Sequence, residues 1–150
     1  MHESEFRTML DQSQRHWWYR GRRRIVRDVL DTLPLPSPAR ILDAGCGSGA
    51  MLDELARYGK VWGVEPHPLG VAAAHRAGHP TVTRARVEEL PFGADEFDLV
   101  ACLDVIEHTP DDAAALAELH RVTRPGVRTA RGATVRRAAG RPTARARPRP

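Results

Sequence analysis

Apolar residues along this chain fall into short blocks that predict alternating helices and strands. Over residues 19–33 the apolar positions recur at spacings of three and four, which is typical of an amphipathic helix: Ile25, Val26, Val29, Leu30 and Leu33. A proline-rich stretch comes next and ends that helix. Residues 40–43 and 61–65 predict strands, and the nearly continuous apolar run over residues 97–103 predicts a strand that is buried on both faces.

The segments between these strands predict helices. We expect them over residues 51–58, over 69–77, and from Asp111 or Asp112 to Val122, with a further short strand over 81–83. Alternating strands and helices indicate an α/β fold with a parallel sheet.

Residues 41–49, Ile-Leu-Asp-Ala-Gly-Cys-Gly-Ser-Gly, carry the clearest chemical signal in the chain. A predicted strand runs into Asp43 and then into three glycines at alternating positions, and glycines let a ligand approach the backbone closely. A carboxylate at this point does not suit a pyrophosphate, but it suits a ligand with a cationic end. The spacing Gly45-x-Gly47-x-x-Ala50 also satisfies the dinucleotide fingerprint. An NAD-type oxidoreductase fragment is therefore an alternative.

This stretch resembles motif I of the class I S-adenosylmethionine-dependent methyltransferases of the small-molecule type. Residues 61–65 resemble the second strand of that family, which ends in an acid. Residues 88–92 and 97–100 resemble the region that leads into its fourth strand, and residues 104–108 resemble the segment directly after that strand. Residues 121–126 resemble the turn before its fifth strand.

The resemblance runs from about residue 16 to residue 126. It implies a Rossmann-like three-layer sandwich with an incomplete parallel sheet of strand order 3-2-1-4 and an N-terminal helical segment. It also implies S-adenosyl-L-methionine as the cofactor and a small molecule as the methyl acceptor. The residues that it assigns to the cofactor are Asp43, Gly45, Cys46, Gly47, Gly49, Glu65, Pro66, Val87 and Glu88. No metal site is expected, because the two cysteines form no metal-ligand pattern.

Two positions concern the nucleoside part of the cofactor. Glu65 ends the predicted second strand, where the acid of either family accepts hydrogen bonds from ribose hydroxyls. Arg86 departs from the family pattern, in which an acid at this position binds the adenine amino group. The Val87 backbone remains available to the ring edge, and Glu88 replaces the missing acid only if the loop slips by two residues.

His108 is the candidate catalytic residue, as a general base for a hydroxyl acceptor. An equally good alternative is that Glu107 and His108 only fix the loop. Residues 16–19, His-Trp-Trp-Tyr, resemble the aromatic start of one branch of these enzymes, in which the N-terminal helix closes over the cofactor. The arginines at positions 20 and 22–24 are interpreted as the solvated face of that helix.

Charge divides the chain into two parts. Residues 1–120 hold 13 Lys plus Arg against 19 Asp plus Glu, whereas residues 121–150 hold ten Arg and no acid. We therefore expect a partial methyltransferase domain over 1–126 and a disordered Arg/Ala/Pro-rich tail over 127–150. Our hypothesis for the tail is a change of reading frame near codon 127, which would leave a truncated and inactive domain. An evolved basic tail is the alternative.

The tail and the start of the chain bear on partners and location. The ten arginines of residues 121–150 attract phosphate without sequence specificity, so nucleic-acid binding through the tail is a further alternative function. No aromatic residue for base stacking accompanies them, so no dedicated nucleic-acid partner is expected. No apolar run approaches the roughly 20 residues that span a bilayer, and no signal peptide is visible at the start. These patterns predict a cytoplasmic protein without a membrane partner.

Overall fold

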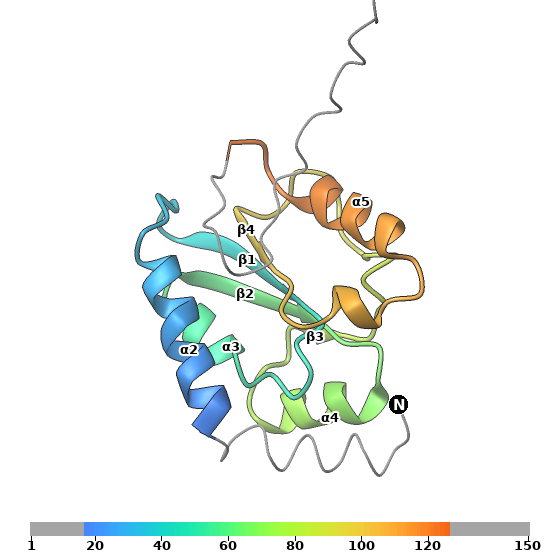
Figure 1. Ribbon diagram of the computed structural model, residues 1–150, viewed down its shortest axis with the longest axis horizontal. Coiled ribbons are helices and arrows are strands. Elements are labelled where there is room, and N and C mark those ends of the chain that lie inside the picture. The colour runs from blue at the N-terminus through green and yellow to red at the C-terminus, as the bar shows by residue number, and fades with distance from the viewer. Residues whose placement is uncertain (1–16, 127–150) are drawn as a thin grey trace, which may run out of the picture.

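Four parallel strands form one sheet in the computed structural model, which describes residues 17–126 (Figure 1). The predictions for the tail, and for side chains up to residue 20, lie outside the described residues. The strand order β3-β2-β1-β4 confirms the predicted order. The strands are β1 (Ala39–Ala44), β2 (Gly59–Val64), β3 (Val82–Thr83) and β4 (Leu99–Ala101).

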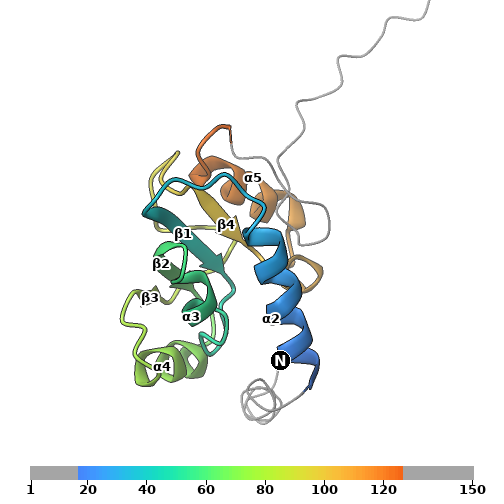
Figure 2. The same cartoon turned by 90° about the vertical axis from the view of Figure 1, so that its left-hand side faces the viewer.

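Helices cover both faces of this sheet and complete the predicted three-layer sandwich (Figure 2). Helices α2, α3 and α4 pack against one face, and α5 packs against the other. A short 3₁₀-helix, η1, precedes α5. The bounds are α2 (Trp17–Leu30), α3 (Leu52–Leu55), α4 (Pro68–Arg76), η1 (Ile106–His108) and α5 (Asp112–Val122).

The central strand β1 is buried on both faces. Ile41 packs with Val26 and Leu30 of α2, whereas its neighbour Leu42 packs with Val122 of α5. Each fully buried aliphatic side chain of this kind contributes about 1.5–3 kcal/mol to folding. The two halves of the core thereby fix the carboxyl end of β1, where Asp43 lies.

Strand β4 is shorter than the predicted range 97–103, and the two residues before it make contacts of their own. Phe97 pairs with Thr123, in the segment directly after α5. The Asp98 carboxylate accepts hydrogen bonds from the Arg40 backbone N–H at 2.8 Å and from Arg124 at 2.6 Å. The chain after α5 is thus held against the start of β4.

Two helices also differ from their predictions. Helix α3 spans four residues rather than the range 51–58, because i→i+3 hydrogen bonds from Arg57 and Tyr58 tighten its end into turns. In α2, Val26 and Leu30 are buried as predicted, but Ile25 is 63% exposed. The apolar spacing therefore predicted the helix correctly but included an exposed residue in its buried face.

Candidate functional site

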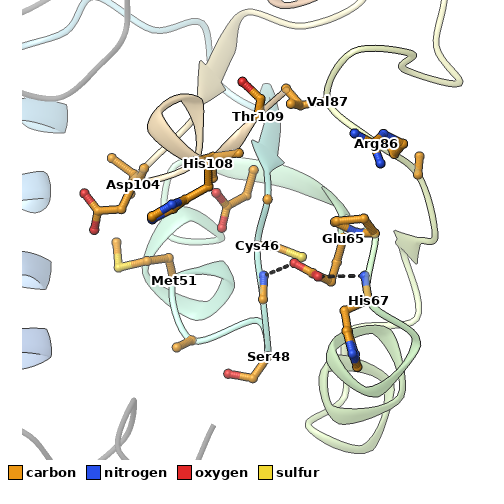
Figure 3. Close-up of a pocket in the computed structure, with 18 of the residues that line it drawn as sticks. Cys46, Ser48, Met51, Glu65, His67, Arg86, Val87, Asp104, His108 and Thr109 are labelled. Carbon is orange, nitrogen blue, oxygen red and sulfur yellow. Dashed lines mark hydrogen bonds between the residues drawn. The ribbon is translucent and has the colours of Figure 1, made fainter. Parts of the chain in front are cut away.

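A cavity of about 700 Å³ opens at the carboxyl ends of the strands (Figure 3). Because those ends share one edge of a parallel sheet, segments that are distant in sequence meet there. The volume lies within the range of small-molecule and cofactor sites. The predicted site residues that line it are Asp43, Gly45, Cys46, Gly47, Glu65, Pro66, Val87, Glu88 and His108.

Gly49 is the one predicted site residue that the cavity lining does not include. A Cβ built on it would lie 3.1 Å from Leu52 Cδ1 and 3.3 Å from the Ala74 Cβ. This glycine therefore allows α3 and α4 to pack closely, and its predicted contact with a ligand stays a prediction.

The loop after β1 presents backbone to the cavity. Its N–H groups at Gly45 and Cys46 donate to the Val64 carbonyl at 2.8 and 3.0 Å, which hooks the loop over the end of β2. Gly45 has a φ of +84°, and a Cβ there would lie 2.4 Å from Val105 Cγ2. Gly47 has a φ of +57° with nothing within 4 Å of a built Cβ, so its open side is available to a ligand.

Glu65 joins this loop to the start of α4. Its Oε2 accepts a hydrogen bond from the Gly47 N–H at 3.0 Å, and its Oε1 accepts one from the His67 N–H at 2.8 Å (Figure 3). Burial raises the pKa of this carboxyl, and the two N–H donors act in the opposite direction. A carboxylate has about four acceptor positions, so each oxygen retains capacity for a further donor such as a hydroxyl.

Asp43 is a buried carboxylate at the end of β1, with only 3% of its surface exposed. Burial raises its pKa to about 7; the positive charge of Arg22 opposes this shift and the negative charge of Glu65 adds to it. Within residues 17–126 its carboxylate forms no hydrogen bond. A buried acid in this state fits a cationic ligand group that approaches from the cavity.

The segment between β3 and β4 forms the wall beyond Glu65. Val87 is buried in the core, and the side chains of Arg86 and Glu88 on either side of it line the cavity. The Arg86 guanidinium lies 2.7 Å from the Glu88 carboxylate and holds the pKa of that carboxyl below its usual range.

The opposite side of the cavity comes from the chain after β4. His108 and Asp104 reach this side from that segment, and Met51 reaches it from the start of α3 (Figure 3). Asp104 has a φ of +55°, which non-glycine residues seldom adopt, and its carboxylate lies 2.7 Å from the Arg22 guanidinium.

Arg22 and Arg23 were missed by the sequence analysis as cavity residues. Both line the cavity, so their interpretation as a solvated helix face was wrong. A signal was available for Arg22, which lies four residues before Val26 and eight before Leu30. Side chains at that spacing share one face of a helix, and this face is the buried one.

The described residues offer neither a reactive thiol nor a group of metal ligands. Cys46 and Cys102 are buried free thiols; burial raises the pKa of both, that of Cys102 to about 12, so they stay protonated near neutral pH. Among residues 17–126 no three His, Cys, Asp or Glu side chains are grouped to hold a metal ion. No helix in the same range is long and apolar enough to cross a membrane.

Comparison with known proteins identifies the family. The model of the family described as "Methyltransferase domain" matches residues 42–130. The chain belongs to this family. A methyltransferase domain at these positions includes the glycine loop, Glu65, the Arg86–Glu88 segment and His108.

Curated relatives agree with this assignment. The ubiquinone biosynthesis O-methyltransferase of Hahella chejuensis is 36% identical over 106 residues, which is 66% of this chain and 44% of that protein. The corresponding protein of a Methylobacterium species is 37% identical over 67% of this chain and 42% of its own length. The chain therefore spans less than half the length of these relatives.

Solved structures share the fold of this methyltransferase domain. An S-adenosylmethionine-dependent methyltransferase of Thermotoga maritima, described as a possible histamine N-methyltransferase, is 25% identical with a TM-score of 0.62, covering 79% of this chain and 55% of that one. The [4+2]-cyclase SpnF is also 25% identical, with a TM-score of 0.64 over 75% of this chain and 44% of that one. The family and the Thermotoga structure imply S-adenosylmethionine as the cofactor, whereas the cyclase shows that the fold alone does not fix the reaction.

The site residues fit this cofactor. S-adenosylmethionine carries an ammonium group, a ribose diol and an adenine ring. The cavity offers an acid without a hydrogen bond at Asp43, a carboxylate with free acceptor capacity at Glu65, and open space at Gly47. NAD-type binding, the alternative drawn from the glycine spacing, is not favoured by the family match.

Proposed function

We propose that this chain binds S-adenosylmethionine in the cavity and takes part in methyl transfer to a small molecule. The observation that supports this most directly is the pair of buried carboxylates at the ends of adjacent strands, Asp43 and Glu65. Neither forms a salt bridge within residues 17–126, and both line one cavity beside an open glycine. A ligand with a cationic end next to a diol satisfies both acids.

The remaining cofactor contacts follow from the order in which these residues lie along the cavity wall. In this proposal Asp43 binds the ammonium group, and the backbone of Gly45, Cys46 and Gly47 accommodates the ligand chain. Glu65 accepts the ribose hydroxyls beside Pro66. The adenine ring then lies next to Val87 and Glu88. Bound in this way, the cofactor supplies an electrophilic methyl group on a sulfonium, and the protein contributes mainly positioning.

His108 is proposed as the general base for acceptors that must lose a proton. The relatives in Hahella and Methylobacterium are named O-methyltransferases, which supports a hydroxyl as the acceptor group. A small-molecule acceptor and a cytoplasmic location belong to the same proposal. The predicted alternative of nucleic-acid binding concerns the tail, outside the described residues.

Calorimetry on the full chain tests the proposal. S-adenosylhomocysteine should bind with one-to-one stoichiometry, and NAD should not compete with it. Binding of NAD instead, or of neither compound, would overturn the assignment. Transfer of a labelled methyl group from S-adenosylmethionine to hydroxylated aromatic compounds then tests His108: His108→Asn should slow transfer without changing the affinity for S-adenosylhomocysteine.

A further inference from the structure

Asp104 holds a backbone conformation that few non-glycine residues adopt, and it does so at the cavity. It lies three residues after the end of β4, has a φ of +55°, and lines the cavity. A residue stays in such a conformation only where the surrounding structure holds it there, and residues of this kind cluster at functional sites. The contacts that hold Asp104 therefore indicate what its conformation does.

Arg22 holds Asp104 from helix α2. Its guanidinium lies 2.7 Å from the Asp104 carboxylate and also donates to the carbonyl of the preceding residue at 3.4 Å. The helix is anchored directly after this arginine. Val26, one turn later, is buried, and the Arg27 guanidinium donates to both oxygens of Glu54 at 2.6 and 2.7 Å. The ion pair thus ties Asp104 to a fixed part of the fold.

The conformation of Asp104 directs the chain into η1. The next residue, Val105, packs so closely on the glycine loop that a Cβ on Gly45 would lie 2.4 Å from Val105 Cγ2. The Val105 carbonyl accepts a hydrogen bond from the His108 N–H at 2.9 Å. His108 ends η1 and reaches the cavity beside Asp104 (Figure 3). The position of the His108 ring therefore depends on how the chain leaves Asp104.

We propose that Asp104 is the positioning residue of His108. Its left-handed backbone turns the chain toward η1, and its ion pair with Arg22 keeps that turn in place. This role rests on the proposed function, because it takes His108 as the general base. Without the ion pair, position 104 relaxes to a negative φ and η1 shifts, which moves the base out of reach of the acceptor. The acids assigned to the cofactor lie on other strands and are not displaced.

Kinetics of methyl transfer to a hydroxylated aromatic compound test this role in the full chain. Asp104→Ala removes the ion pair and disfavours a positive φ, so kcat should fall at least about tenfold, within the range that a general base contributes. The affinity for S-adenosylhomocysteine should change much less. Asp104→Asn should recover most of kcat, because asparagine tolerates a positive φ and its amide oxygen still accepts from Arg22.

Asp95→Ala is the matched control. Asp95 has a similar φ of +53°, but it lies in an exposed turn and does not line the cavity. This variant carries the same backbone strain, so it should lose stability and keep kcat. A fall in kcat equal to that of Asp104→Ala would show that strain alone lowers activity, and the positioning role would be wrong.

A double variant distinguishes positioning from a general structural defect. Adding His108→Asn to Asp104→Ala should lower kcat little further, because both changes remove the same base. The part of the pH profile of kcat that is lost in His108→Asn should also be lost in Asp104→Ala. Additive losses, or a pH profile of Asp104→Ala that matches the parent chain, would overturn the proposal. Asp104→Gly accepts a positive φ but lacks the ion pair, so it provides the same comparison where thermal unfolding shows that Asp104→Ala does not fold.

Nuclear magnetic resonance gives a readout that needs no turnover. The ring signals of His108, assigned by comparison with His108→Asn, should shift when S-adenosylhomocysteine binds to the parent chain, and they should shift less in Asp104→Ala. If His108→Asn slows transfer but Asp104→Ala matches the parent chain in both measurements, the positioning role is wrong and the general base stands. If His108→Asn changes nothing, the base and its positioning are both wrong and the cofactor assignment stands. If the parent chain neither binds S-adenosylhomocysteine nor transfers a methyl group, the proposed function is wrong as well.

Discussion

The Arg22 guanidinium lies 2.7 Å from the Asp104 carboxylate, so helix α2 is tied to the chain segment after β4. Arg22 also donates to the Leu103 carbonyl at 3.4 Å, and its charge opposes the rise in the pKa of Asp43. One arginine from the N-terminal helix thus influences two walls of the cavity.

Removal of this tie should cost little stability, because the Asp104 side chain is 61% exposed. We expect a coupling energy of about 0.5–1 kcal/mol in a double-mutant cycle of Arg22→Met and Asp104→Asn, measured by denaturant unfolding. Arg24→Met, an exposed arginine of the same helix, is the control and should change stability by less. A coupling energy of zero would show that the contact does not hold α2 in place.

The pKa of Asp43 predicts an unusual pH dependence of stability. Burial raises this pKa from 3.8 to about 7, so the folded state holds the proton more tightly than the unfolded state. This contribution is complete below pH 4 and is lost as the pH rises through about 7. Between pH 5 and 8 the free energy of unfolding should fall, by on the order of 2 kcal/mol from this group. Asp43→Asn should show a flatter profile, and parallel profiles for the two proteins would contradict the prediction.

The same pKa predicts that ligand binding releases protons. A cationic group beside Asp43 favours its ionised form, so binding of S-adenosylhomocysteine near pH 7 should release a fraction of a proton. Calorimetry in two buffers of different ionisation enthalpy measures this release. It should vanish in Asp43→Asn, and equal release in both proteins would place the titrating group elsewhere.

Gly47→Val should abolish binding of S-adenosylhomocysteine, because the side chain would enter space that is open in the cavity. A positive φ also strains the β-branched residue, which lowers stability by itself. Gly78→Val separates the two effects. Gly78 has a φ of +96° and equally open surroundings but does not line the cavity, so this control should lose stability and keep its affinity.

Glu65→Ala should weaken binding by roughly 1.5–3 kcal/mol, the scale of hydrogen bonds to a charged group. The loss should be confined to ligands with free ribose hydroxyls. A 2′,3′-dideoxy analogue of S-adenosylhomocysteine provides the comparison, and an equal loss for this analogue would refute the assigned role. Glu65→Gln keeps an acceptor for one of the two backbone N–H groups and should be affected less.

Local patterns in the sequence were sufficient for the strands, and the resemblance to the methyltransferase family supplied the sheet order and most of the cavity residues. Short apolar segments located β1 and β2, and the acids at their carboxyl ends were read directly from the chain. The errors concern contacts between distant segments. Phe97 pairs with Thr123 outside the short β4, and the approach of α2 to Asp104 brings Arg22 to the cavity. Periodicity identifies which side of an element is buried, but it does not identify the neighbour that covers it.

The hydrogen bonds of Glu65 have a consequence for altering ligand preference. The carboxylate that is proposed to hold the ribose also clamps the glycine loop to the start of α4 through Gly47 and His67. Substitutions there change the scaffold and the recognition chemistry together, so neither can be tuned alone. Libraries that aim at modified nucleosides should leave position 65 intact and diversify positions 86 and 88, whose side chains line the cavity on a segment that α5 supports.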